Sequence, residues 1–341
     1  MLRLLFALLV VFSHAQILTA SGDGVVILGQ HLGSWAVVGF FGISGYLITG
    51  ARIRSDAGTY LINRVARIFP AFVFVLVFVA FFLAPLTMHI ESGSIDGYFG
   101  TSPTPLDYIY SNLLLKVSYY HIGTTLSTHP LTAWNGSLWS LSYEFWCYII
   151  IGVFMSWKFL RERVWPTLIL FILFTAAHMG IAYLRPYIGN NYDLELLIFM
   201  TPYFMGGAIV YQMRDRLPMR HMYAIIALAA SLFLVWYFPG FGKQLAAPTI
   251  AYIVLYLGSV LPSPRFTKVH DISYGVYIFH FPIIQFLIAL KVHLLGFWPF
   301  LFVTLLMTCA LATASWFGIE RAAMRWVRGR KPWADIRKSA H

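Results

Sequence analysis

Charged residues are scarce in this sequence of 341 residues: Asp, Glu, Lys and Arg together make up 11% of it, whereas hydrophobic residues account for 59%. Soluble globular domains carry about 25% charged residues. A water-exposed surface cannot be covered with so few charges, so the composition excludes a soluble globular enzyme. The high apolar content also excludes an intrinsically disordered chain. The class that remains is a polytopic membrane protein.

Cysteine is almost absent as well, since the sequence contains only Cys147 and Cys309, both within apolar runs. They form no CxxC pair and no metal-binding spacing, so the sequence predicts neither a disulfide framework nor a zinc site. It also lacks a Walker A motif, a Rossmann glycine fingerprint, an HExxH motif and a carboxylate-rich cluster. These absences disfavour an ATP-driven pump, and we predict that no metal is bound.

Acidic residues are fewer than basic ones, 13 against 24, which gives a net charge of +11. A basic chain can bind nucleic acid, but the cytoplasmic loops of membrane proteins also accumulate Lys and Arg. Membrane topology therefore explains the excess, and we predict no nucleic-acid partner.

Long apolar runs, by contrast, are plentiful, and a membrane-spanning helix needs about 20 such residues. Ten runs approach that length: 4–20, 33–50, 69–90, 138–157, 164–184, 194–213, 220–238, 244–261, 272–291 and 296–318. With ten spans, 20 of the 24 basic residues fall in one alternating set of loops and 4 in the other. The richer side is the cytoplasm. We therefore predict an all-α, polytopic membrane bundle of about ten transmembrane helices with both termini in the cytoplasm.

Two segments lie outside the predicted spans. The longest connection, residues 91–137, is predicted on the outer side. Within it, residues 106–117 could form a helix in the membrane interface, or the loop could be an ordinary aromatic-rich tether, and the sequence leaves both open. Residues 319–341 are predicted to be a basic cytoplasmic tail on anionic membrane lipid, so that residues 1–318 form the membrane domain.

Titratable side chains inside spans are costly and need a reason. His14 and Glu144 each lie six residues from the outer end of their predicted spans, which is roughly 9 Å below the outer boundary at the rise of an α-helix. If the two side chains meet, Glu144 would orient the imidazole of His14 for general-base catalysis. A packing histidine and a structural carboxylate are the alternatives, and the shared depth favours the catalytic interpretation.

Two further pairs share a helix face because their members are three residues apart. Tyr277 and His280 could line a cavity or simply bond to another helix. Arg64 and Arg67 could hold a phosphate or carboxylate, although taken alone they are better explained by contact with lipid. The run at residues 40–48 has small residues at 42, 44 and 45, which predict a close helix contact.

Five motifs follow one another along the chain: Arg3 followed after ten residues by His14, Phe-Phe-x-x-Ser-Gly-Tyr-Leu-Ile at 40–48, Arg-x-x-Arg-Ile-x-Pro at 64–70, Ser-Leu-Trp-Ser-Leu-x-x-Glu-Phe at 137–145, and Ser-Tyr-x-x-Tyr-x-x-His-x-Pro at 273–282. In this order they resemble the motifs of the acyltransferase 3 family of integral-membrane acyltransferases, which includes O-acetyltransferases of surface polysaccharides and lipid-linked sugars. A departure occurs near the end, where the family often has Ile-Glu-Arg-Pro and this chain has Ala322 in place of the proline.

The resemblance implies a cytoplasmic acyl-CoA donor, such as acetyl-CoA, and a carbohydrate or lipid-linked glycan acceptor at the outer side. It implies that His14 and the arginines Arg3, Arg64 and Arg67 are essential. We therefore predict that the three arginines bind the donor. His14, oriented by Glu144, would act as general base or carry a transient acyl group.

One alternative keeps His14 and Glu144 but changes their function. A secondary transporter or sugar-lipid exporter could use them as a proton relay, although the sequence shows no inverted repeat. Either protein would be an integral, multi-pass protein of a bacterial plasma membrane.

Overall fold

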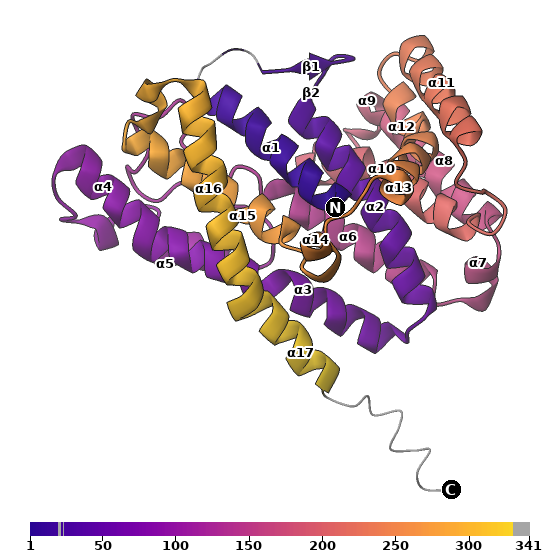
Figure 1. The fold of residues 1–341 in the computed structure, drawn as a ribbon, viewed down its shortest axis with the longest axis horizontal. Coiled ribbons are helices and arrows are strands. Elements are labelled where there is room, and N and C mark those ends of the chain that lie inside the picture. Colours follow the sequence, from indigo (N-terminus) through magenta and orange to yellow (C-terminus); the bar gives the residue numbers. More distant parts are fainter. Residues whose placement is uncertain (20–21, 23, 330–341) are drawn as a thin grey trace, which may run out of the picture. The chain divides into compact units, whose positions relative to one another are not determined.

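The computed structural model describes residues 1–19, 22 and 24–329, without the side chains of Lys268 and Arg328 (Figure 1). The longer helices are α1 (Leu2–Leu18), α2 (Leu32–Ile53), α3 (Ala57–Phe78), α6 (Trp139–Phe154), α8 (Trp165–Met179), α10 (Tyr192–Gln212), α11 (His221–Tyr237), α13 (Ala247–Val260), α15 (Ser273–Ala289) and α16 (Phe297–Ser315). The shorter ones are α4 (Ala84–Ser92), α5 (Pro105–Asn112), α7 (Lys158–Glu162), α9 (Ile181–Leu184), α12 (Gly242–Leu245), α14 (Arg265–Val269) and α17 (Arg321–Gly329).

Short π-helical and 3₁₀ turns interrupt or extend these helices. The π-helical turns are η1 (Val79–Leu83) and η4 (Trp316–Glu320), and the 3₁₀ turns are η2 (Tyr98–Gly100) and η3 (Val292–Leu295). Strands β1 (Val26–Ile27) and β2 (Gln30–His31) form an antiparallel hairpin. In the described part of the chain the fold is otherwise helical, which confirms the predicted all-α class.

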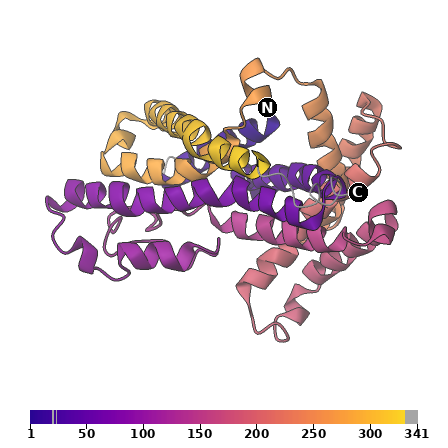
Figure 2. The same cartoon turned by 90° about the horizontal axis from the view of Figure 1, so that it is seen from below.

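Ten apolar helices coincide with the ten predicted runs. Four stretches are long and apolar enough to cross a membrane: Leu32–Ile53, Ala57–Ser92, Tyr192–Gln212 and Phe297–Val327. The other six are shorter, and they are α1, α6, α8, α11, α13 and α15. Figure 2 shows the second stretch as one long purple helix, because α3 continues through η1 into α4. The sides on which the termini lie stay a prediction.

The chain divides into two compact units, of which the first contains Met1–Phe6, Val26–Tyr60 and Ser140–Arg265. In it, α10 packs against α2, α8 and α13. A Cβ atom on Gly45 would overlap the carbonyl oxygen of Phe204, and one on Gly207 would overlap the carbonyl oxygen of Gly42. The two helices therefore touch through their backbones, and the close helix contact predicted at residues 42–45 is confirmed.

The second unit contains Ala7–Val25, Leu61–Trp139 and Phe266–His341. Its central element is α15, which is buried along its whole length except at Phe286. Helix α16 lies against it so closely that a Cβ on Gly275 would come within 2.8 Å of the Cα of Ala312. Because α15 is surrounded by protein, its polar side chains must find partners within the fold.

The long connection at 91–137 is folded. Its aromatic side chains Tyr98, Tyr108 and Trp134 are almost completely buried. The segment predicted as a possible helix at 106–117 forms α5 as far as Asn112. Thr104 and Asp107 cap α5 reciprocally, each side chain accepting a hydrogen bond from the other residue's backbone N–H.

The predicted domain boundary at residue 318 falls within a helical run, since α16, η4 and α17 follow one another without a break. The first part of the predicted basic tail is therefore helical. Its remaining residues, 330–341, lie outside the described part of the chain. The division at residue 318 stays a prediction.

Candidate active site

Helix α1 carries both residues of the first motif. Arg3 and His14 are eleven residues apart, which is about three turns of an α-helix and roughly 16 Å along its axis. The two side chains therefore leave α1 on nearly the same face. The ten intervening residues of the motif thus place the two side chains about three helical turns apart.

His14 contacts a second histidine that the sequence had also singled out. Nδ1 of His14 lies 2.8 Å from Nε2 of His280 on α15. The two rings are nearly parallel, with an interplanar angle of 8° and a centroid separation of 5.1 Å. The ring of Phe281 closes one side of His14 at 5.2 Å, edge to face. His280 itself is 0% exposed.

The other ring nitrogen of His280 faces the backbone of its own helix. Nδ1 lies 2.7 Å from the carbonyl oxygen of Tyr277 and 3.3 Å from that of Val276. The hydroxyl of Tyr277 donates to the carbonyl oxygen of Ser137, at the end of the long connection, over 2.9 Å. The predicted pair Tyr277 and His280 is thus joined to His14 on one side and to residue 137 on the other.

Glu144 on α6 accepts two hydrogen bonds at the same carboxylate oxygen. The hydroxyls of Ser44 and Tyr148 donate to Oε1 over 2.5 and 2.6 Å. Sequence reasoning missed both partners. Tyr148 could have been found, because it lies four residues from Glu144 on one helix face; Ser44 is a hundred residues away and was interpreted only as a packing residue. His14 and Glu144 fall in different units, so their pairing stays a prediction.

The two arginines in the first half of α3 differ sharply in their contacts. Arg67 donates from Nη1 to Oε2 of Glu320 and from Nη2 to Oδ2 of Asp271, each over 2.8 Å. Its guanidinium also lies over the rings of Trp316, at 5.2 Å, and Tyr274, at 5.7 Å. Both terminal nitrogens of Arg67 are therefore already engaged by carboxylates of the protein.

Arg64, one turn earlier on the same face, makes no hydrogen bond to any residue that the structure describes, and its Nε is buried. A buried guanidinium nitrogen without an acceptor is unusual in a folded protein. Arg64 therefore keeps its full capacity to bind an anion.

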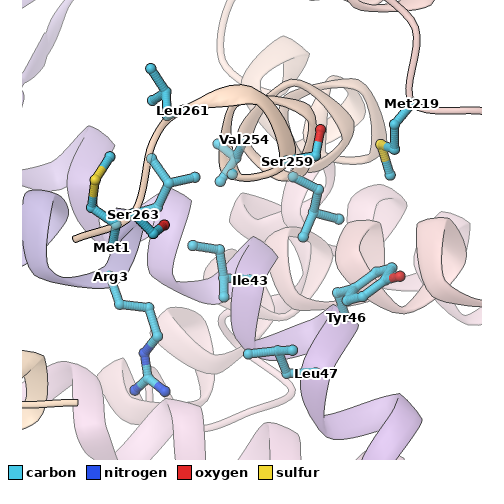
Figure 3. A pocket seen from close by; sticks show the side chains of 13 residues that line it. Met1, Arg3, Ile43, Tyr46, Leu47, Met219, Val254, Ser259, Leu261 and Ser263 are labelled. Atoms are coloured by element: carbon cyan, nitrogen blue, oxygen red, sulfur yellow. The ribbon is translucent and has the colours of Figure 1, made fainter. Parts of the chain in front are cut away.

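Arg3 borders a cavity of about 440 Å³ within the first unit (Figure 3). Apolar side chains such as Leu47 and Val254 form much of the lining, and Tyr46, Ser259 and Ser263 add hydroxyl groups. Figure 3 shows Met1 and Arg3 on one side of the cavity and Tyr46 on the other. The cavity thus combines an apolar wall with one cationic side chain, which suits an amphipathic anion.

The fold and the site define a helical membrane protein whose first helix carries an arginine and a partly buried histidine that is hydrogen-bonded to a second histidine. Residues 1–317 match the acyltransferase domain of the acyltransferase 3 family. The chain belongs to this family, as its motifs predicted, and it is therefore an acyltransferase and a multi-pass membrane protein. Membership of this family favours the enzyme over the transporter alternative and implies that an acyl donor is bound.

Proteins similar to this chain include O-acetyltransferases. An O-acetyl transferase of Shigella phage Sf6 is 28% identical over 332 residues, covering 94% of this chain and 93% of the relative. Nodulation protein 10 of Rhizobium leguminosarum bv. viciae is 27% identical, with 95% and 92% covered. A putative peptidoglycan O-acetyltransferase of Bacillus subtilis is 25% identical over 86% of this chain, which spans 52% of that protein. No solved structure matches the chain.

Proposed function

We propose that this protein transfers an acetyl group from cytoplasmic acetyl-CoA to a hydroxyl of a carbohydrate or lipid-linked glycan at the outer side of a bacterial plasma membrane. Two of the similar proteins are named as O-acetyltransferases, one of them putatively of peptidoglycan. The alternation of basic loops along the sequence supports delivery of the donor from the cytoplasm. The family accounts for acyl transfer, and these observations support the donor and acceptor.

The observation that carries the proposal is the position of His14. Its ring is hydrogen-bonded to His280 within the protein, on the helix that also carries Arg3. As general base, His14 takes the proton of the acceptor hydroxyl while the hydroxyl oxygen attacks the thioester carbonyl. The C–S bond then breaks, and the proton passes to the sulfur of the departing coenzyme A. An acyl-histidine route would use the same ring as nucleophile.

The donor end of the proposal rests on the arginines. Arg64 has uncommitted donors suited to a phosphate group of coenzyme A. Arg3, beside its partly apolar cavity, would serve the donor as well. The carboxylate contacts of Arg67 favour an indirect contribution, in which it anchors α3 to Asp271 and Glu320.

The experiment compares cells that lack this gene and are complemented with wild type, His14→Ala or His178→Ala. His178 lies on α8 and serves as the matched histidine control. Mass spectrometry of the surface glycans should show O-acetyl groups with wild type and with His178→Ala, and their loss with His14→Ala at an equal protein level. Normal acetylation with His14→Ala would remove His14 from the chemistry.

A further inference from the structure

The geometry points to His280 as a positioning residue of the reaction. We propose that it holds His14 in the tautomer that carries its proton on Nδ1, so that Nε2 of His14 is the atom that accepts the proton of the acceptor hydroxyl. This inference rests on the proposed function, because it assigns the base within the same site.

The backbone of α15 locates the proton of His280. Its Nδ1 lies 2.7 Å from the carbonyl oxygen of Tyr277, with the carbonyl of Val276 at 3.3 Å. A carbonyl oxygen can only accept a hydrogen bond, so Nδ1 of His280 must carry a proton. The backbone of α15 thereby sets the tautomer of this ring, and a peptide carbonyl cannot change its role.

The surroundings of the two rings determine their charge. His280 is fully buried, and neither ring forms an ion pair with a carboxylate among the described residues of the second unit. A buried imidazolium without a paired anion is costly, so His280 is neutral at rest. A general base must itself start neutral, so His14 carries a single ring proton before the reaction. With its proton on Nδ1, His280 presents a lone pair at Nε2.

The contact between the two rings locates the proton of His14. Nε2 of His280 accepts, so Nδ1 of His14, 2.8 Å away, must donate. The nearly parallel planes and the 5.1 Å separation of the centroids fit two rings that meet end to end, with N–H and lone pair in the ring plane. The remaining nitrogen of His14, Nε2, then keeps its lone pair.

The chain of hydrogen bonds also serves the reaction itself. When Nε2 of His14 takes the acceptor proton, the ring becomes an imidazolium whose Nδ1–H still points at the lone pair of His280. A new C–O bond forms, the C–S bond breaks, and Nε2–H returns its proton to the coenzyme A sulfur. His280 thus occupies the place that a carboxylate holds in a base–acid pair, but it adds no charge to the interior.

Substitutions at position 280 separate the two roles of the ring. In His280→Gln, the longer amide can place an oxygen near the former Nε2 and accept from His14. In His280→Asn, the shorter amide can still donate to the Tyr277 carbonyl but cannot reach His14. We expect His280→Asn to lower kcat on the order of 100-fold, with KM for acetyl-CoA unchanged, and His280→Gln to recover part of that loss.

The spectroscopic readout is independent of turnover. Protein labelled with ¹⁵N and ¹³C histidine in lipid vesicles reports the tautomer of each ring, and the signal missing from His14→Ala identifies His14. Wild type should show His14 protonated on Nδ1, and His280→Asn should show a mixture. A wild-type signal from Nε2–H, or an unchanged kcat in His280→Asn, would overturn the proposal.

The two hypotheses fail in different ways. If His14→Ala leaves acetylation intact while the Nδ1–H signal is present, the catalytic role of His14 in the proposed function fails and the tautomer assignment holds. If His14→Ala abolishes acetylation while the wild-type signal comes from Nε2–H, the function holds and the role of His280 is wrong. Should His280→Asn not fold, the wild-type spectrum and His280→Gln still decide.

Discussion

Helix α15 and the residues just before it carry two polar networks of opposite kinds. At the start, Asp271 shares Arg67 with Glu320 through two ion pairs of 2.8 Å. Nine residues further along the chain, His280 and His14 are joined by a hydrogen bond between uncharged rings. The segment from Asp271 to His280 thus takes part in a paired-charge network at one end and in a neutral relay at the other.

The difference lies in what each network leaves available. Both terminal nitrogens of Arg67 contact carboxylates, and one of these, on Glu320, is 0% exposed. Such a network can hold helices together but has little capacity for a ligand. The histidine pair uses three of its four ring nitrogens, and Nε2 of His14 is left for chemistry. Charge pairing therefore indicates a structural role here, whereas a lone pair that can accept a proton indicates a catalytic one.

Arg67→Met breaks the ionic network and should have the largest effect on stability. It removes a cation that two carboxylates share. We expect a loss of roughly 3 kcal/mol, at the low end for broken buried pairs because Asp271 is 37% exposed. Thermal unfolding in detergent measures it. Arg185→Met, which removes the exposed partner of Glu195, should cost less than about 1 kcal/mol; equal losses would refute the comparison.

Arg64→Ala removes the arginine whose N–H groups make no hydrogen bond to any described residue. We expect acetyl-CoA binding, measured by calorimetry in detergent, to weaken about tenfold, since a hydrogen bond to a charged group contributes roughly 1.5 kcal/mol. The free energy of unfolding should change little in Arg64→Ala, in contrast to Arg67→Met. The control is Arg216→Ala, an exposed arginine in another basic segment. Unchanged affinity in Arg64→Ala would remove Arg64 from the donor site.

Gln285→Leu extends the comparison further along α15. Its amide donates to the carbonyls of Leu131 and Ala133 over 2.6 and 2.7 Å, and its oxygen lies 2.9 Å from Nδ1 of His129. We expect a loss of about 2 kcal/mol, because buried groups lose their hydrogen-bond partner, and faster hydrogen exchange around residues 129–134.

Gln244→Leu is the matched control for Gln285→Leu. Both polar atoms of Gln244 are buried without a hydrogen-bond partner among the described residues. Replacing it should therefore be neutral or stabilising. If both leucine variants destabilise equally, the hydrogen bonds of Gln285 are not the cause of its effect.

The smallest effect is expected at Asp107, an exposed residue of the long connection at 91–137. Hydrogen bonds from the Thr104 side chain and backbone lower the pKa of Asp107 below its ordinary 3.8. A carboxyl whose pKa is lower in the folded than in the unfolded state stabilises the fold at pH values above its unfolded pKa. This stabilisation is lost as the pH falls through the folded pKa. Proteolysis of α5 should accelerate below pH 3.8 in wild type. The protection above that pH should be absent in Asp107→Asn.

The partners of Glu144 and His14 show how far local reasoning reaches. The depth of both residues in their helices follows from counting, and Tyr148 could have been assigned to Glu144 by its spacing of four. The contact of His14 with His280 spans 266 positions, and counting along one helix says nothing of which helix packs beside it. Likewise, the spacing of Arg64 and Arg67 placed them on one face but did not show that acids engage only one of them.

The sequence by itself determined the all-α class, the positions of ten apolar helices and the alignment of Arg3 with His14. These are local properties, because a helix in lipid satisfies its own backbone and its hydropathy can be summed residue by residue. Only the tertiary structure decided that His280 contacts His14, that Ser44 contacts Glu144 and that Asp271 and Glu320 engage Arg67. Those pairings depend on which helices pack together and at what register, and that is settled by the shapes of whole surfaces.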